Sequence, residues 1–218
     1  MTTFAADPPA DCALCPRLVA LRHELQDEEP DWHNAPVGSF GPDNAKLLIV
    51  GLAPGRTGAN RTGRPFTGDY AGDLLYATML KYGFASGTYA SRPDDGLKLR
   101  GAMITNAVRC LPPQNKPIGA EIASCRPFLR AQIDSLPDLR VILALGRIAH
   151  ESVLRTFGLK LREATFGHGA RHALGHSLSL FDSYHCSRYN TNTRRLTPGM
   201  FEDVFAGISK HIAARQTI

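Results

Sequence analysis

The stretch over residues 46–69, KLLIVGLAPGRTGANRTGRPFTGD, constrains the fold of this chain most. It opens with an apolar, β-branched run over 46–50, which is typical of a central parallel strand. Gly and Pro residues then keep the backbone irregular until a helix begins near residue 71. Ligands in open α/β sheets bind at the carboxyl ends of strands, so this long loop predicts a site rather than a surface turn. Its charged side chains, Arg56, Arg61, Arg64 and Asp69, favour a polar ligand. Neither GxxxxGK[ST] nor a GxGxxG after the strand is present, so the usual phosphate loops do not fit.

The rest of the chain alternates between strand and helix patterns. Further buried strands are expected at 101–108, 140–145 and 178–181, and helices at 13–28, 71–82, 118–133, after Gly146 through 157, and at 200–214. Segment 85–97 is turn-rich, and 159–175 is expected to be a hairpin tip or loop with solvated histidines. This order predicts an α/β fold, a three-layer α/β/α sandwich around a central, mainly parallel four-stranded sheet. With 218 residues and no linker, a single domain over 1–218 is expected.

Composition excludes some classes of protein. The chain is 43% hydrophobic and 21% charged, and no apolar run reaches the length of a membrane span. The first residues lack a basic segment followed by an apolar core, so we expect a cytoplasmic protein without a secretion signal. A net charge of +5 permits nucleic-acid binding without demonstrating it.

The cysteines favour a metal or cluster site over disulfides. Five cysteines are an odd number in a chain without a secretion signal. Cys12 and Cys15 have a spacing that recurs in zinc and iron–sulfur sites, and Cys110 and Cys125 would supply a second pair. Small buried cysteines remain the alternative for all four.

Three strand-end motifs carry the strongest resemblance to a known family. They are GLAPGRTGANRTGRPFTGD at 51–69, ITNAVRCLPPQNKP at 104–117 and YHCSRYNTNTRRLT at 184–197. Together with the four cysteines, they resemble the family 5 (type B) uracil-DNA glycosylases from Cys12 through Thr197. The resemblance implies hydrolysis of the N-glycosidic bond of uracil in DNA, during base excision repair, by a monofunctional enzyme without lyase activity. It also implies a structural [4Fe–4S] cluster held by Cys12, Cys15, Cys110 and Cys125. Cys186 matches no ligand position.

The same resemblance assigns roles around an extruded base. A flipped base needs an aromatic plane and groups that read its edge. Phe66 would supply the plane, Asn106 the amide, and His185 a hydrogen bond to O2 as negative charge develops there. Backbone amides of the turn with Gly51, Ala53 and Gly55 would contact a carbonyl.

One difference from the wider superfamily determines which carboxylate we expect to orient the attacking water. Many relatives carry a polar water-orienting residue just after the leading Gly of the first motif, where this chain has Leu52 and Ala53. The resemblance moves that role to Asp69, whose carboxylate would orient water and stabilise an oxocarbenium-like sugar. Asp73 is the alternative acid, although a first-turn helix residue is the simpler interpretation.

The expected partner is DNA containing uracil or another deaminated base, such as hypoxanthine or xanthine. The last motif would place Asn190 at the substrate and a loop in the minor groove, although its arginines could equally be a solvated face. We expect DNA contacts from Arg61, Ser187, Arg188, Tyr189, Thr193, Arg194 and Arg195. We also expect a monomer, associated with the nucleoid, without a membrane or an obligate protein partner. A non-catalytic cluster protein that binds nucleic acid is the rival interpretation, whereas the H-x-E and P-C-x-x-C pattern of zinc deaminases is absent.

Overall fold

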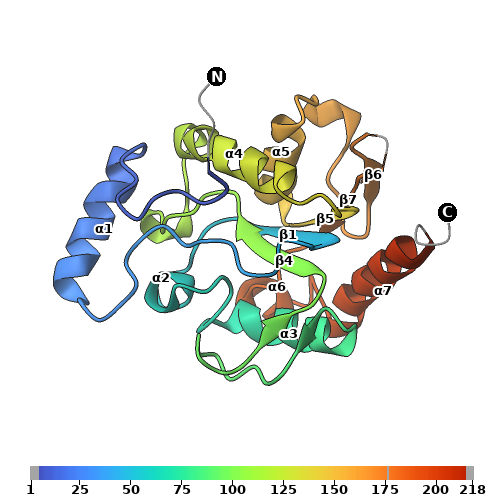
Figure 1. The fold of residues 1–218 in the computed structure, drawn as a ribbon, viewed down its shortest axis with the longest axis horizontal. Coiled ribbons are helices and arrows are strands. Elements are labelled where there is room, and N and C mark those ends of the chain that lie inside the picture. Colours follow the sequence, from blue (N-terminus) through green and yellow to red (C-terminus); the bar gives the residue numbers. More distant parts are fainter. Residues whose placement is uncertain (1–4, 176, 215–218) are drawn as a thin grey trace.

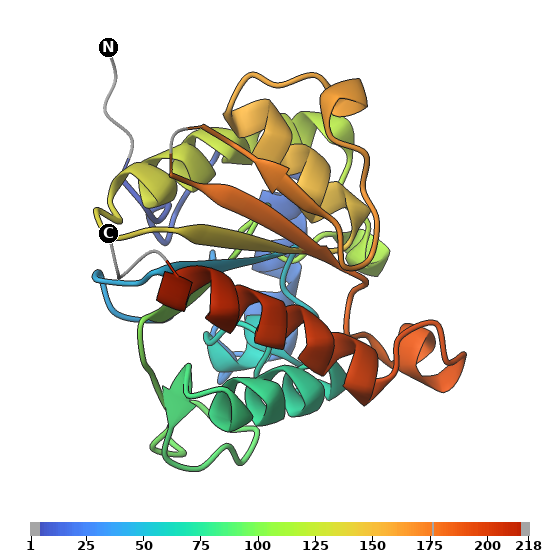
Figure 2. The same ribbon diagram turned by 90° about the vertical axis from the view of Figure 1, so that its right-hand side faces the viewer.

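The computed structural model describes residues 5–175 and 177–214, so both ends of the domain expected over 1–218 lie outside the described residues. A central sheet lies between two helical layers (Figures 1 and 2). Within the described residues, no helix is both long and apolar enough to cross a bilayer.

The sheet has the order β4-β1-β5-β7-β6, and the first four strands are parallel. Its strands are β1 (Leu47–Gly51), β4 (Ala102–Asn106), β5 (Val141–Leu145), β6 (Arg171–Ala173) and β7 (Ser179–Ser183). All four predicted strands are confirmed as the parallel part. The expected loop over 159–175 is wrong in part, because β6 pairs antiparallel to β7 and makes a fifth strand.

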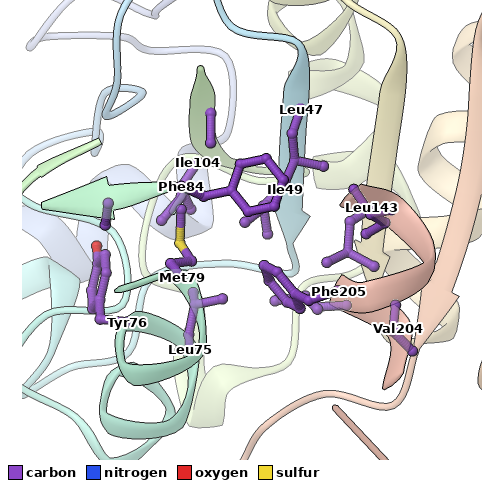
Figure 3. Close-up of a cluster of buried hydrophobic side chains, with 14 of the residues drawn as sticks. Leu47, Ile49, Leu75, Tyr76, Met79, Phe84, Ile104, Leu143, Val204 and Phe205 are labelled. Atoms are coloured by element: carbon purple, nitrogen blue, oxygen red, sulfur yellow. The ribbon is translucent and has the colours of Figure 1, made fainter. Parts of the chain in front are cut away.

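Alternate residues of each central strand pack against different helices, as expected for a parallel sheet covered on both faces. One face buries Leu47 and Ile49 against α3 (Tyr70–Lys81) and α7 (Pro198–Ala214), as Figure 3 shows. The other face buries Leu48 and Val50 against α4 (Gly119–Asp134) and α5 (Arg147–Thr156). The three-layer sandwich predicted from the sequence is therefore confirmed.

The remaining elements are short, apart from one helix. The first helix, α1 (Pro16–Glu28), begins directly after Cys15, where proline suits the first helical position. The others are α2 (Ala59–Thr62), β2 (Ala85–Ser86), β3 (Lys98–Leu99), the 3-10 turns Pro113–Asn115 and Leu161–Glu163, and α6 (Arg188–Asn192). Strands β2 and β3 form a small ribbon at the two ends of the turn-rich segment.

Candidate functional site

Three parallel strands end at one cavity of about 330 Å³. Gly51 and Asn106 are paired in register at the ends of β1 and β4, and His185 follows two residues after the end of β7. The cavity is lined by Leu52, Ala53, Pro54, Gly55, Ala59, Phe66, Asp69, Tyr70, Ala71, Asn106, Asn115, His185, Ser187 and Arg188. The sheet edge therefore collects the side chains that the sequence predicted would meet there.

Asn106 is buried to 3% exposure, and its side-chain oxygen Oδ1 has no hydrogen-bond partner among the described residues. A buried carbonyl oxygen left unpaired is costly, which points to a ligand donor that completes it. Gly51 makes room for this arrangement. A Cβ atom at Gly51 would overlap Asn106 Oδ1 and lie 2.8 Å from Cζ of Phe66. Packing therefore requires glycine at position 51, while the predicted contact of its backbone amide with a carbonyl stays a prediction.

Phe66 and His185 both line the cavity, and their rings stack on each other. Their ring centroids lie 5.7 Å apart with an interplanar angle of 28°. Phe66 is buried and has a left-handed backbone, with φ of 52°. Burial lowers the pKa of His185 to about 4, so its imidazole is neutral near pH 7 and carries one N–H. The backbone carbonyl of His185 is held by the Asn190 side-chain amide at 2.8 Å.

Asp69 is the N-cap of α3, and its carboxylate accepts a hydrogen bond from the Gly72 N–H at 3.3 Å. Burial raises the pKa of Asp69, and the charge of Asp73 raises it further, while the backbone amides of Gly72 and Ala71 oppose the shift. The carboxylate is therefore a stronger proton acceptor than an exposed aspartate.

An outer groove of about 530 Å³ adjoins the cavity. Asp69, Tyr70 and Arg188 line both, whereas Arg61 and Asp73 line only the outer groove. The guanidinium of Arg188 lies over the Tyr70 ring, 5.3 Å from its centroid. Asp69 thus lies where the cavity meets the groove, and Asp73 is exposed outside the cavity.

The segment after His185 forms α6 and a turn, where a loop was expected. Tyr189 is 72% exposed, and Arg194 has a left-handed backbone with φ of 56°. Arg195 stacks over Tyr184, 4.6 Å from the ring centroid, and the Thr193 hydroxyl donates to the Tyr189 carbonyl at 2.7 Å. At the start of this segment, Ser187 and Arg188 line the cavity, and Arg194 lines a further groove together with Tyr70 and Asp73.

Four cysteines converge in a second place, a small apolar pocket between α1, α4 and the loop after β4. Cys12, Cys15, Cys110 and Cys125 all line it, and none is in a disulfide. Burial raises the pKa of Cys110 to about 12 and that of Cys125 to about 11, and neighbouring thiolates add to both shifts. The Arg109 N–H donates to Cys125 Sγ at 3.3 Å. Four thiolates of this kind fit an iron–sulfur cluster or a zinc ion, either of which would compensate their charge.

Comparison with known proteins assigns the family. The model of the uracil DNA glycosylase superfamily matches residues 38–208. The chain belongs to this superfamily. The type-5 uracil-DNA glycosylase of Thermus thermophilus is 47% identical to the chain over 199 residues, covering 88% of the chain and 90% of the relative. The type-5 uracil-DNA glycosylase of Mycobacterium tuberculosis is 41% identical, covering 91% and 77%. A type-4 uracil-DNA glycosylase from Sulfurisphaera tokodaii is 30% identical, covering 75% and 70%. The resemblance to family 5 read from the three motifs is confirmed.

As a superfamily member, the chain gathers most, but not all, of the predicted residues at the cavity. Asn190 does not line the cavity. Its side-chain amide donates a hydrogen bond to the backbone carbonyl of His185, which does line it. Arg64 and Arg56 do not face a ligand: Arg64 is buried against Asp95, and Arg56 pairs with Glu28 on the surface. The expectation that these two arginines serve a polar ligand is therefore wrong.

Sequence reasoning missed Asn115, which lies on the cavity wall. Asn115 and Gln114 both have left-handed backbones, with φ of 57° and 55°. Strained backbones of this kind gather at functional sites. The run of Pro and Asn at 112–117 marks a turn, but nothing in it shows that the turn returns to the cavity.

The prediction that the histidines of residues 159–175 are solvated is also wrong. His168 is half-buried, and its Nδ1 accepts the Tyr184 N–H at 3.2 Å, so it must be deprotonated there. His150 and His172 bond to the buried carboxylate of Asp182 at 2.7 Å and 3.0 Å. The other ring nitrogen of His150 lies 2.9 Å from the Ala164 carbonyl, so both nitrogens must donate. His150, His172 and Asp182 carry ligand atoms that could hold a metal ion, but hydrogen bonds among them already satisfy these atoms.

Proposed function

We propose that the protein excises uracil from DNA by hydrolysing its N-glycosidic bond, as a base excision repair enzyme. The observation that carries the proposal is the convergence of Asp69, Asn106, His185 and Phe66 on one cavity. The named relatives are type-5 uracil-DNA glycosylases, and the three motifs that support the family also contain these four residues.

The cavity suits a flipped pyrimidine. The unpaired Oδ1 of Asn106 would accept the N3–H of uracil, and its side-chain NH₂ would donate to O4. The Phe66 ring would stack on the base, and backbone amides near Gly51, Ala53 and Gly55 would bind a carbonyl. Thymine presents the same N3–H and O4 groups as uracil, so Asn106 would not distinguish the two bases. Exclusion of the methyl group of thymine would depend on the cavity wall.

The chemistry follows from the two titratable groups. A water held by Asp69 bonds through its oxygen to C1′ of the sugar and gives a proton to the carboxylate. The bond from C1′ to N1 breaks, and its electron pair leaves with the base. The neutral N–H of His185 donates to O2, where the negative charge collects. The base then takes a proton from solvent. The junction of cavity and outer groove is the position at which Asp69 would meet the sugar.

The DNA backbone would follow the outer groove. Arg61 and Arg188 line it, and Ser187, Thr193, Arg194 and Arg195, which lie in or next to α6, would add further contacts. We propose that the exposed Tyr189 ring enters the space that the flipped nucleotide leaves. Phosphate contacts would set the register, while the cavity would select the base.

We propose that Cys12, Cys15, Cys110 and Cys125 hold a structural [4Fe–4S] cluster. Bound there, the cluster would cross-link the N-terminal segment to the loop after β4. Glycosidic hydrolysis moves no electrons, so no redox step is assigned to it. An iron-to-zinc ratio and visible absorbance measured on freshly purified protein distinguish the cluster from zinc.

Several finer points belong to the same proposal. A cavity of about 330 Å³ is large enough to consider purine lesions, so hypoxanthine and xanthine are proposed as further substrates. None of the described residues lining it is a lysine, which supports hydrolysis without a lyase step. We propose a monomer that works on DNA at the nucleoid in the cytoplasm.

The deciding experiment is single-turnover excision from matched duplexes carrying uracil, hypoxanthine, xanthine or thymine. We expect excision of uracil, leaving an alkali-labile abasic site and no strand break before alkali treatment. Binding without excision of any base would favour the rival interpretation of a non-catalytic nucleic-acid-binding protein. Strand breaks before alkali treatment would contradict the absence of lyase activity.

A further inference from the structure

A buried ion pair next to Phe66, whose two residues do not line the cavity, carries this inference. Arg64 is 5% exposed and holds the carboxylate of Asp95 with two bonds of 2.8 Å. Its Nε also donates to the hydroxyl of Thr67 at 2.7 Å. Asp95 accepts the backbone N–H groups of Ala90 and Leu97, at 2.9 Å and 3.1 Å. Arg64 thereby ties the loop 51–69 to the distant segment 89–97.

Two tyrosine hydroxyls complete the attachment. Tyr76 donates to the Pro65 carbonyl at 2.6 Å, and Tyr89 donates to the Phe66 carbonyl at 3.2 Å. Both rings also lie under the Arg64 guanidinium, 5.6 Å and 5.9 Å from its central carbon. A Cβ atom at Gly72 would overlap both the Phe66 carbonyl oxygen and the Tyr89 hydroxyl, so only glycine allows this approach.

These contacts surround a backbone that is unfavourable by itself. Phe66 has φ of 52°, a region that non-glycine residues occupy at a cost unless their surroundings enforce it. The bonds hold the carbonyls on both sides of the strained Phe66 residue, at Pro65 and Phe66. This backbone sets the direction of the Cα–Cβ bond of Phe66 and so limits the positions that its ring can take at the cavity.

We infer that Arg64, Tyr76, Tyr89 and Asp95 form a Phe66 clamp, a set of positioning residues that orients the stacking ring before DNA arrives. The clamp touches neither base nor sugar. It removes the ordering cost that a mobile loop would incur when the base enters, which is the energetic benefit of preorganisation. The inference rests on the proposed stacking role of Phe66, and it adds that segment 89–97 tunes recognition of the base from outside the cavity.

The test uses Tyr89→Phe, which deletes one hydroxyl and keeps the ring. Affinity is measured by titration for two otherwise identical duplexes, one with a non-cleavable fluorinated deoxyuridine and one with an abasic site. A lost neutral hydrogen bond corresponds to about a two- to tenfold effect. We therefore expect about that loss on the fluorinated uridine duplex, and a change under about twofold on the abasic duplex, which has no base to stack. Tyr82→Phe is the control, because its ring packs against Phe205 rather than on the loop.

Phe66→Ala separates the inference from the proposed function. If Phe66 stacks on the base, Phe66→Ala weakens binding of the fluorinated uridine duplex, and Tyr89→Phe added to it has no further effect. Equal losses on both duplexes for Tyr89→Phe, or the same loss in the Phe66→Ala background, would overturn the clamp and leave only a structural role. Unchanged binding by Phe66→Ala would instead refute the stacking role itself.

Discussion

Asp69 combines two functions at one position, because it caps α3 and also faces the cavity. The cap fixes the carboxylate against the helix N-terminus, where a negative charge is favoured. Burial acts in the opposite direction and raises the pKa of Asp69. Ionised Asp69 is therefore held in a place where its charge is costly, which is typical of residues kept for chemistry.

Asp69→Asn should separate binding from catalysis. Asparagine is an equally good N-cap and removes the buried charge, so the free energy of unfolding should be no lower than that of the parent. The excision rate should fall by about a hundredfold to ten-thousandfold, with affinity for a uracil duplex unchanged. Single-turnover assays and urea unfolding measure the two quantities. A near-parental rate for Asp69→Asn, with slow excision by Asp73→Asn, would transfer the role to Asp73.

The pH dependence of the excision rate should reflect the titration of Asp69 rather than that of His185. The pKa of Asp69 lies above 3.8 in the fold, so activity is lost as the pH falls through that raised value and the carboxylate is protonated. His185 has a pKa of about 4 and stays neutral over the working range. A single-turnover rate profile over about pH 5 to 9 should therefore show no inflection near 6.5, the ordinary value for histidine. Such an inflection that disappears in His185→Gln would show that His185 acts as a cation.

At the scale of elements, the site depends on short segments that join the strand ends to their surroundings. In the turn following α6, Arg194 lines a groove together with Tyr70, which also lines the cavity, and Arg195 lies over Tyr184. Segment 89–97 reaches Arg64 from the far side of the loop 51–69. Both segments act at the edge of the site, so their effects should appear in binding and in stability.

Replacing Arg194 and Arg195 with Ala should weaken binding to duplexes of any sequence. Removing one arginine–phosphate ion pair should lower the slope of log affinity against log salt by about one. Arg130→Ala with Arg155→Ala on α4 and α5 is the matched control, since it removes the same charge from another part of the surface. An equal change of slope in both pairs would assign the effect to net charge alone.

Asp95→Asn should destabilise the fold. Its pKa is held well below the usual range by Arg64, so this carboxylate stabilises the protein above the pKa of the unfolded chain and stops doing so as the pH falls. Breaking a buried pair costs about 3–5 kcal/mol, whereas exposed Asp94, 3.7 Å from Arg92, should lose less than about 1 kcal/mol as Asn. Urea unfolding at neutral pH compares the two variants. Equal stability of Asp95→Asn and Asp94→Asn would contradict the importance of the buried pair.

The sequence predicted the long elements because their apolar patterns are unambiguous. β1 and β4 are continuous apolar runs, and the site follows once their ends share an edge. Arg64 was misassigned because its partner, Asp95, lies 31 residues away in a segment without periodicity. β6 was missed because its residues are mostly exposed and lack an apolar alternation. The apolar pattern of each segment was therefore enough to predict the long strands and helices. The burial of Arg64 was not predictable from it, because this burial depends on a contact with a residue distant in the sequence.

At the scale of the whole molecule, two sites share one loop. The loop after β4 begins beside Asn106, passes Cys110 and turns at Asn115 on the cavity wall. The cysteine pocket also receives Cys12 and Cys15 from the N-terminal part of the chain. The loop after β4 therefore connects the pocket that holds Cys12 to the wall of the cavity.

Cys12→Ser should lower iron content and thermal stability more than it alters the chemical step. Loss of one ligand weakens the cross-link between α1 and the loop after β4, so the midpoint of thermal unfolding should fall. Cys186→Ala is the control, because its thiol bonds to the Ala71 carbonyl in the main core and should keep the iron. Iron analysis, melting curves and rates per folded molecule measure the effects. Zinc without iron in the parent protein would refute the cluster.

With the proposed cluster bound, the shared loop would also make the site sensitive to oxidants. The cysteine ligands of a cluster are thiolates, the form of this side chain that oxidants attack. Damage at Cys110 would release the strand-to-turn connection that carries Asn106 and Asn115, while Asp69 and His185 remain chemically intact. Oxidation would then weaken recognition of the base while Asp69, the proposed proton acceptor, stays unchanged.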